Sequence, residues 1–378
     1  MPVSYRPSLF FDGEQFHQDP CITIEDNQVL SLEPRAGAQI VELDGLLAPG
    51  FVDVQVNGGG GVLFNQAPMP GTFETMVRAH VRFGTTAMLP TLITDGLGVI
   101  QQAADAMAQA ITDKMPGVLG IHFEGPHLSE PKKGIHRQQF IRPISDAELE
   151  QFCRQDLGKV LVTLAPENVP PDVIRELVSK GVKVCLGHSN ADVDKVLAAI
   201  EAGADGFTHL FNAMSAMTSR APGMVGAALA SDSYCGLIVD HYHVHPVSAK
   251  AAIKAKGIER IMLVTDAMAH VGAQMDELPF FDTRIRRDGD KLTIPGGTLA
   301  GSALDMASAV RNCHRDLGFD LSKTLQMAAL TPASYLGLDK QIGKLKPGYR
   351  ADMVLLDEQQ QVKQCWIGGE ECISVALT

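Results

Sequence analysis

The sequence predicts an α/β fold: a (β/α)8 TIM-like barrel with a small β-sandwich domain formed by both chain ends. Apolar, strand-like runs alternate with amphipathic helical segments through the middle of the chain. Eight such runs lie between residues 51 and 268, which is the number of strands that closes a barrel of this type. Both chain ends, in contrast, contain short strand patterns and few of helical length.

The first 45 residues consist of short strand patterns and turns. Asp12-Gly13 is a hairpin signal between apolar flanks, and Asp26-Asn27 separates two alternating segments. The end of the chain, from Asp352 onward, likewise has two apolar runs broken by turn-like polar residues. We therefore predict two domains. Residues 1–46 and 343–378 together form a small β domain, and residues 47–342 form the barrel domain.

The predicted barrel strands cover 51–56, 85–93, 117–125, 159–167, 181–189, 206–214, 234–243 and 260–268. The predicted helices between them cover 73–84, 98–111, 146–155, 172–181, 192–203 and 247–257. Repeated strand–helix units imply parallel strands. A doubly wound open sheet is the alternative fold. The barrel is favoured because polar residues cluster at the carboxyl ends of the strands throughout the series.

Composition excludes several classes of protein. Lys and Arg number 32 against 44 Asp and Glu, so the net charge is -12 and there is no basic run for nucleic acid or an anionic membrane. No stretch of about 20 apolar residues suggests a membrane span, and the N-terminus lacks the pattern of a signal peptide. The seven Cys are widely separated, without a C-x-x-C pair. We expect a cytoplasmic protein, in which an anionic substrate needs a local basic pocket.

Three strand ends carry metal-ligand side chains. H-F-E-G-P-H-L ends a strand at Glu124, L-G-H-S-N-A at His188 and F-T-H-L-F-N-A-M at His209. Each residue alone is typical of a cap, a loop or a satisfied core position. Together they supply one carboxylate and two imidazoles, and zinc hydrolases commonly use this set with a fourth position open for water. The coincidence favours a metal site.

Asp266 ends the last predicted strand, in V-T-D-A-M. A carboxylate there could accept a proton from water and pass it to a leaving group. The alternative is a helix N-cap. His136, Asn212 and Arg220 lie in nearby loops, where the simplest interpretation is an exposed side chain. The tract V-D-H-Y-H-V-H is compatible with substrate contacts or with a metal site of its own.

The ordered motifs D-V-Q-V-N-G, H-F-E-G-P-H-L, K-K-G-I-H, G-H-S-N-A, T-H-L-F-N-A-M, V-T-D-A and G-T-L-A-G-S-A-L resemble those of the N-acetylglucosamine-6-phosphate deacetylases of the amidohydrolase superfamily. The resemblance extends from residue 47 to residue 357. It implies the same barrel fold, and hydrolysis of the acetamide of N-acetyl-D-glucosamine 6-phosphate to D-glucosamine 6-phosphate and acetate in amino-sugar metabolism. A catalytically silent scaffold and an amidohydrolase for a cyclic amide or N-acyl amino acid are the alternatives.

The resemblance also implies residue roles, motif by motif. Glu124, His188 and His209 correspond to the metal ligands, and Asp266 to the general base and acid. His136 corresponds to the residue that polarises the amide carbonyl. The residues that correspond to substrate contacts, the phosphate-binding pair Arg220 and His243 included, are Ile135, His136, Asn212, Ala213, Arg220, His243, Leu299, Ala300 and Gly301.

Many amidohydrolases carry an H-x-H pair on the first strand, where this chain has Gln55-Val56-Asn57. Because neutral amides are poor zinc ligands, we expect one divalent ion per subunit, zinc first, with Fe²⁺, Co²⁺ or Ni²⁺ as alternatives. The resemblance implies a homo-oligomer, a dimer or tetramer, that binds a phosphorylated amino sugar. Arg220 would then serve its own site or a neighbouring subunit's. His241 and His245 receive no assigned role, and a weak contact to a second metal is the alternative for them.

Overall fold

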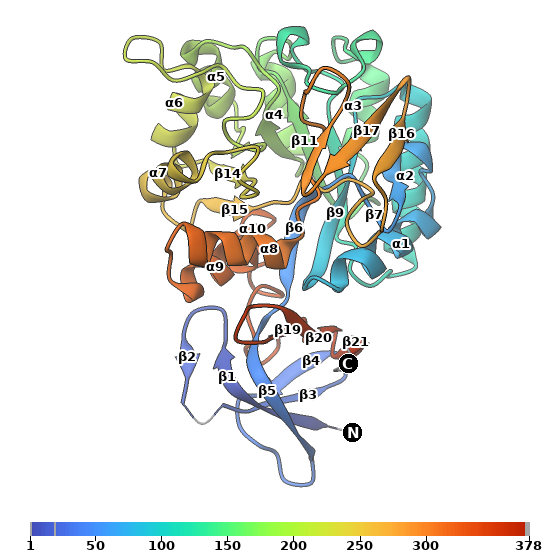
Figure 1. Cartoon of the computed structure of the whole chain (residues 1–378). Coiled ribbons are helices and arrows are strands. Elements are labelled where there is room, and N and C mark those ends of the chain that lie inside the picture. Colours follow the sequence, from blue (N-terminus) through green and yellow to red (C-terminus); the bar gives the residue numbers. More distant parts are fainter. Residues whose placement is uncertain (1, 19, 375–378) are drawn as a thin grey trace.

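The computed structural model describes residues 2–18 and 20–374. Figure 1 shows a large α/β body at the top and a smaller sheet below it, which contains strands from both ends of the chain. No helix in these described ranges is long and apolar enough to cross a bilayer. The boundaries proposed above for the two domains stay a prediction.

The eight parallel strands of the barrel follow one another in sequence order, and this confirms the predicted fold. They are β6 (Phe51–Val56), β9 (Thr85–Ile93), β10 (Gly120–Glu124), β11 (Lys159–Leu164), β12 (Lys183–Leu186), β13 (Gly206–Phe207), β14 (Tyr234–Leu237) and β15 (Ile261–Leu263). A parallel bridge between Val56 and Ala267 brings the segment after the last strand beside the first. The sheet is therefore nearly closed, which an open doubly wound sheet would not be.

Helices surround this sheet (Figure 1). They are α1 (Pro70–Val81), α2 (Leu97–Thr112), α3 (Asp146–Phe152), α4 (Pro171–Ser179), α5 (Val193–Glu201), α6 (Gly223–Ala230), α7 (Pro246–Lys256), α8 (Met306–Arg311), α9 (Leu321–Ala328) and α10 (Leu330–Tyr335). Each of the six predicted helices overlaps one of them. Helix α6 was not predicted because its residues 223–228 are all buried, so the helix has no polar face to create a periodic pattern.

Shorter elements complete the chain. They are β7 (Gly58–Gly59), β8 (Val62–Leu63), 3-10 turns at Phe64–Gln66, Glu130–Lys132 and Gln138–Phe140, and a π turn at Asn312–Asp316. A three-stranded antiparallel sheet, also not predicted, contains β16 (Glu277–Phe280), β17 (Thr283–Asp288) and β18 (Lys291–Thr293). Its Leu278 and Phe280 pack in one apolar cluster with Met268 and Ala300. This packing fixes the segment around Ala300 beside the strand ends.

The lower sheet joins the two ends of the chain. Its strands are β1 (Val3–Phe11), β2 (Phe16–His17), β3 (Ile22–Glu25), β4 (Gln28–Ser31), β5 (Gln39–Pro49), β19 (Met353–Leu356), β20 (Val362–Ile367) and β21 (Glu370–Ser374). The order is β21-β20-β19-β5-β1-β3-β4, with β2 on β1. An isolated bridge joins Gln28 in β4 to Arg350, and the core of this sheet includes Phe10, Leu47 and Trp366. The predicted turns at 12–13 and 26–27 connect paired strands.

Candidate metal centre and active site

A pocket of about 320 Å³ opens at the carboxyl ends of the barrel strands. Its lining combines the three predicted metal ligands, Asp266 and most of the predicted substrate contacts: Asn57, Ile93, Glu124, Pro131, Lys132, Gly134, Ile135, His136, His188, His209, Asn212, Ala213, His243, Asp266, Thr298, Leu299 and Gly301. Strand ends that are far apart in sequence meet here because the strands are parallel, so that all their carboxyl ends lie at the same end of the barrel.

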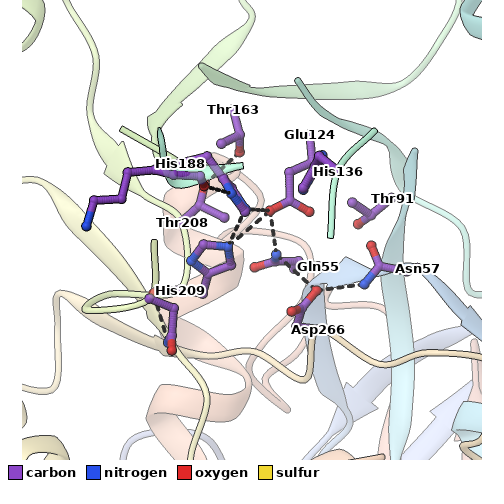
Figure 2. Close-up of polar contacts among 12 residues, drawn as sticks. Gln55, Asn57, Thr91, Glu124, His136, Thr163, His188, Thr208, His209 and Asp266 are labelled. Atoms are coloured by element: carbon purple, nitrogen blue, oxygen red, sulfur yellow. Dashed lines mark hydrogen bonds and ion pairs between the residues drawn. The ribbon is translucent and has the colours of Figure 1, made fainter. Parts of the chain in front are cut away.

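Glu124, His188 and His209 converge in this pocket (Figure 2). The Nε2 atoms of His188 and His209 lie 3.1 and 3.2 Å from Glu124 Oε1. The two Nε2 atoms are 2.9 Å apart, and all three side chains are buried. Within residues 2–18 and 20–374, no other group of three His, Cys, Asp or Glu side chains is arranged to hold a metal ion. The donor set suits zinc.

The ring of His188 is oriented for metal binding. Its Nδ1 lies 2.8 Å from the Lys132 carbonyl oxygen, to which it can only donate, so the lone pair remains on Nε2. Both histidines also have left-handed backbones, with φ of 46° at His188 and 32° at His209. Such conformations cost about 1–3 kcal/mol each and concentrate at functional sites. The surrounding barrel therefore holds these two residues in backbone conformations that are otherwise unfavourable.

Glu124 is an anion in this site. Burial alone would raise its pKa, but the adjoining imidazoles of His188 and His209 hold the pKa well below its usual range. Gln55 Nε2 lies 3.2 Å from Glu124 Oε1 and 3.2 Å from Asp266 Oδ1, so one amide group donates between the two carboxylates. The amide reduces the repulsion that two adjacent carboxylates would otherwise experience.

Asp266 lies half-buried at the end of the barrel, with φ of 52°. Asn57 Nδ2 donates to its Oδ1 across 2.6 Å. Burial, and then the neighbouring Glu124 carboxylate, raise the pKa of Asp266 to about 6. A carboxylate with a pKa near neutrality is suited to accept and return a proton. Gln55 and Asn57, which replace the H-x-H histidines, thus contact the predicted base.

His136 has one free ring nitrogen. The Thr94 backbone N–H donates to its Nδ1 across 3.3 Å, and the Thr94 hydroxyl lies 2.8 Å from the same nitrogen, so a ring that accepts at Nδ1 carries its proton on Nε2. Burial and the neighbouring His188 hold the pKa of His136 well below its usual range, so the ring is neutral. A neutral imidazole in the pocket can therefore donate one hydrogen bond from Nε2. Thr94 was not identified from the sequence, because it contacts a residue 42 positions away and no spacing pattern reveals such a contact.

The other predicted substrate residues divide into two groups. Ile135, Asn212, Ala213, His243, Leu299 and Gly301 line the pocket. Two of the predicted residues, Arg220 and Ala300, do not line the pocket. Arg220 is exposed in the loop before α6, and Ala300 is buried. Ala300 instead donates its backbone N–H to the Leu292 carbonyl, which ties its segment to β18.

The histidine-rich tract separates into different roles. His243 lines the pocket, and its Nδ1 lies 2.6 Å from Asp240 Oδ2. Asp240 also accepts the backbone N–H groups of Tyr242 and His243, an Asp-turn pattern that the sequence could have revealed. His245 caps α7 by accepting the Val247 N–H. His241 lies 2.9 Å from Asp316 Oδ2. Neither of these last two histidines belongs to the metal-binding set.

A further buried acid, Asp53, lies beneath the predicted base and was missed in the sequence. Its Oδ2 accepts the Thr265 hydroxyl across 2.5 Å, and its Oδ1 accepts the Gln55 backbone N–H across 3.1 Å. Burial raises the pKa of Asp53 to about 7, even though Thr265 donates to it. Asp53 thereby ties the first barrel strand to the residue that precedes Asp266.

The model of the Amidohydrolase family matches residues 46–372. The N-acetylgalactosamine-6-phosphate deacetylase of Shewanella sp. (strain ANA-3) is 55% identical over 327 residues, 86% of this chain and 83% of the relative. The N-acetylglucosamine-6-phosphate deacetylase of Vibrio furnissii is 34% identical, covering 99% and 96%. The crystal structure of the N-acetylglucosamine-6-phosphate deacetylase from Pasteurella multocida superimposes with a TM-score of 0.95 at 34% identity, covering 98% and 99%. The chain belongs to the amidohydrolase family.

Proposed function

We propose that this chain hydrolyses the acetamide of N-acetyl-D-glucosamine 6-phosphate, releasing acetate and D-glucosamine 6-phosphate. The observation that carries the proposal is the convergence of Glu124, His188 and His209 beside Asp266 in one pocket. The similarity to sugar-phosphate deacetylases over nearly the whole chain supports the substrate class.

One divalent ion would be held by Glu124, His188 and His209, and zinc is the ion that we expect before the others. Their donor atoms lie within 4.8 Å of one another and are shielded from water, and His188 presents a free lone pair. When bound, such an ion lowers the pKa of water and polarises a carbonyl group. Fe²⁺, Co²⁺ and Ni²⁺ favour overlapping ligand sets, so metal analysis of the purified protein distinguishes them.

Asp266 accepts the proton of the attacking water and returns it to the amide nitrogen as the C–N bond breaks. Its raised pKa suits it to both steps. His136 donates its Nε2–H to the acetyl oxygen as negative charge develops there, an interaction worth about 3 kcal/mol in comparable sites. Gln55 and Asn57 orient the Asp266 carboxylate through their amide groups.

His243 and Arg220 bind the 6-phosphate in this proposal. His243 lines the pocket, with its Nδ1 held by Asp240, so its Nε2 remains for the ligand. Arg220 is exposed and lies outside the pocket of its own chain, which favours a contribution to the pocket of a neighbouring subunit. The active form would then be a homo-oligomer. Arg220→Ala should cost about 2–3 kcal/mol of substrate binding.

The phosphate role has a direct control. Loss of binding in Arg220→Ala should be much smaller with unphosphorylated N-acetylglucosamine than with the 6-phosphate. Equal losses with both sugars would assign Arg220 a structural role. Mixing Arg220→Ala subunits with subunits inactivated at Asp266 tests the subunit assignment. Recovery of phosphate-dependent turnover in mixed oligomers requires that Arg220 acts across the interface.

N-acetyl-D-galactosamine 6-phosphate, the C4 epimer, is a second candidate substrate. The relative at 55% identity is named for that epimer, whereas relatives named for the gluco epimer reach 36%. Acetate release from both 6-phosphates, compared by kcat/KM, decides between them. Turnover of a cyclic amide or an N-acyl amino acid, with neither sugar phosphate hydrolysed, would contradict the proposal altogether.

We also propose a cytoplasmic location. All seven cysteines are free thiols, and five of them are buried. Burial raises the pKa of Cys185 and Cys235 to about 12, so these thiols stay protonated and unreactive. Such a set is typical of a reducing compartment. Fractionation of the native cells with detection of the chain tests the location.

A further inference from the structure

A second cavity, of about 600 Å³, lies on the flank of the barrel and has no part in the proposed reaction. It is bounded by the end of α1, the loop 270–274, the turn between β17 and β18, and helix α8. Three arginines, Arg82, Arg287 and Arg311, line it. Three aspartates, Asp240, Asp290 and Asp305, line it as well.

The three aspartates that line this cavity already have hydrogen-bond or ion-pair partners. Asp240 accepts from His243 and from two backbone N–H groups. Asp305 accepts both the backbone N–H and the hydroxyl of Ser308, at 2.7 and 2.6 Å. Asp290 pairs with Arg287 across 3.1 Å. Each of the three aspartates thus already has a hydrogen-bond or ion-pair partner, and none of these partners is Arg82 or Arg311.

Arg82 and Arg311 form no ion pair with any carboxylate in the described ranges 2–18 and 20–374. Arg82 has only a long contact, 3.4 Å, to the Gly272 carbonyl. Arg311 donates to Ser308 Oγ and to the Gln360 carbonyl, both neutral. Two guanidinium groups therefore face one cavity without a direct ion pair in this part of the chain, and Asp305 acts on Arg311 only through the longer-range attraction of its charge.

His270 is the second, independent indication of a ligand. The residue is 1% exposed, lines the cavity, and has no hydrogen-bond partner at either ring nitrogen among the described residues. Burial, followed by the nearby Arg287, lowers the pKa of His270 to about 4, so the ring is neutral and carries one N–H. Buried polar groups are rarely left unpaired in native proteins, and each exception needs an explanation.

We propose that the flank cavity binds a small oxyanion of the phosphate class. Arg311 and Arg82 would supply the charge, and His270 one neutral hydrogen bond. The site is separate from the reaction pocket but shares a wall with it, because Asp240 lines the flank cavity and holds His243, which lines the pocket. Free phosphate and a sugar phosphate present the same group, and the experiment compares them.

The test is calorimetric titration of the metal-loaded protein with inorganic phosphate, up to about 10 mM so that a millimolar Kd is measurable. We expect Arg311→Gln to weaken binding at one class of site by about tenfold or more. Arg315→Gln is the matched control, because Arg315 also contacts Gln360 but does not line the cavity. The control should bind phosphate as the unaltered protein does. A second titration with glucosamine 6-phosphate shows whether the cavity also admits a sugar.

Arg82→Gln provides a second variant, since Arg82 is exposed and its replacement leaves the buried core intact. It should weaken the same class of site as Arg311→Gln. Indistinguishable isotherms for Arg311→Gln, Arg82→Gln and Arg315→Gln would overturn the proposal, as would a lack of any phosphate binding outside the reaction pocket. Arg220→Ala reports only on the reaction pocket, so its failure to change binding would concern the proposed function and leave the flank site to the Arg311 result.

Discussion

The mouth of the barrel and the sheet at the chain ends differ in backbone strain and in the kind of side chain that they bury. At the mouth, His188, His209 and Asp266 all have positive φ, and carboxylates and imidazoles are buried together. In the lower sheet, Asp26 and Asn27 have positive φ in a turn, where they suit the hairpin, and the main core cluster is apolar although Asp12 and Asp352 are also buried. Strained backbones and buried ionisable side chains thus occur together where the reaction would take place, whereas packing of apolar side chains joins the two chain ends.

The two regions are joined by continuous chain. Strand β5 of the lower sheet leads through Gly50 directly into β6, which carries Gln55. A Cβ at Gly50 would lie 2.2 Å from Thr86 Oγ1, so only glycine allows this close approach to β9. The lower sheet can therefore fix the start of the strand that contacts Asp266. If the comparison holds, changes at the mouth alter chemistry, and changes in the lower sheet alter stability.

Glu124→Gln should have the largest effect. A neutral amide replaces the anionic ligand, so we expect loss of both the bound metal and measurable turnover. Elemental analysis and acetate release measure the two. We expect one tightly bound ion per chain in the unaltered protein. Two tightly bound ions, both needed for activity, would contradict the single site formed by Glu124, His188 and His209.

Trp366→Ala tests the other side of the comparison. Trp366 is 1% exposed in the core of the lower sheet, and removal of a buried Trp typically costs about 3–5 kcal/mol. The free energy of unfolding in urea should fall by that amount, while metal content and KM of the folded protein stay unchanged. A large change in KM would mean that the two regions are coupled more tightly than their separate cores suggest.

Asp266→Asn keeps the shape of the base and removes its ability to accept a proton. Substrate should bind nearly as before, and kcat should fall at least about a hundredfold. Metal content is the control, because Asp266 is not one of the three ligands. Near-normal turnover in this variant would leave Asp266 as a structural residue and refute the proposed chemistry.

The smallest effect concerns Glu14, which joins the chain ends. Hydrogen bonds from Lys344 and then Lys346 lower the pKa of Glu14 to about 2. Because the folded pKa is below the unfolded value of 4.5, this stabilisation is present above pH 4.5 and is lost as the pH falls toward 2. Glu14→Gln should lower Tm slightly at pH 6 and not at pH 2. Glu42→Gln, which removes an exposed pair with Arg6, is the control.

Repetition made the fold predictable. Eight apolar runs between amphipathic helices indicated the barrel, and the same pattern placed Glu124, His188, His209 and Asp266 at strand ends. Features without a pattern were missed. Helix α6 is buried over residues 223–228, and the contacts of Thr94 with His136 join residues that are far apart in sequence. The exposed position of Arg220 depends on a loop path that composition and spacing do not determine.

Acetate release from N-acetyl-D-glucosamine 6-phosphate, measured before and after treatment with a chelator, tests the central claim most directly. We expect the metal-loaded protein to release one acetate for each sugar phosphate consumed. Chelation should abolish the release, and added Zn²⁺ should restore it. Release that continues in the metal-free protein, or no release from either 4-epimer of the 6-phosphate when metal is bound, would contradict a metal-dependent deacetylase.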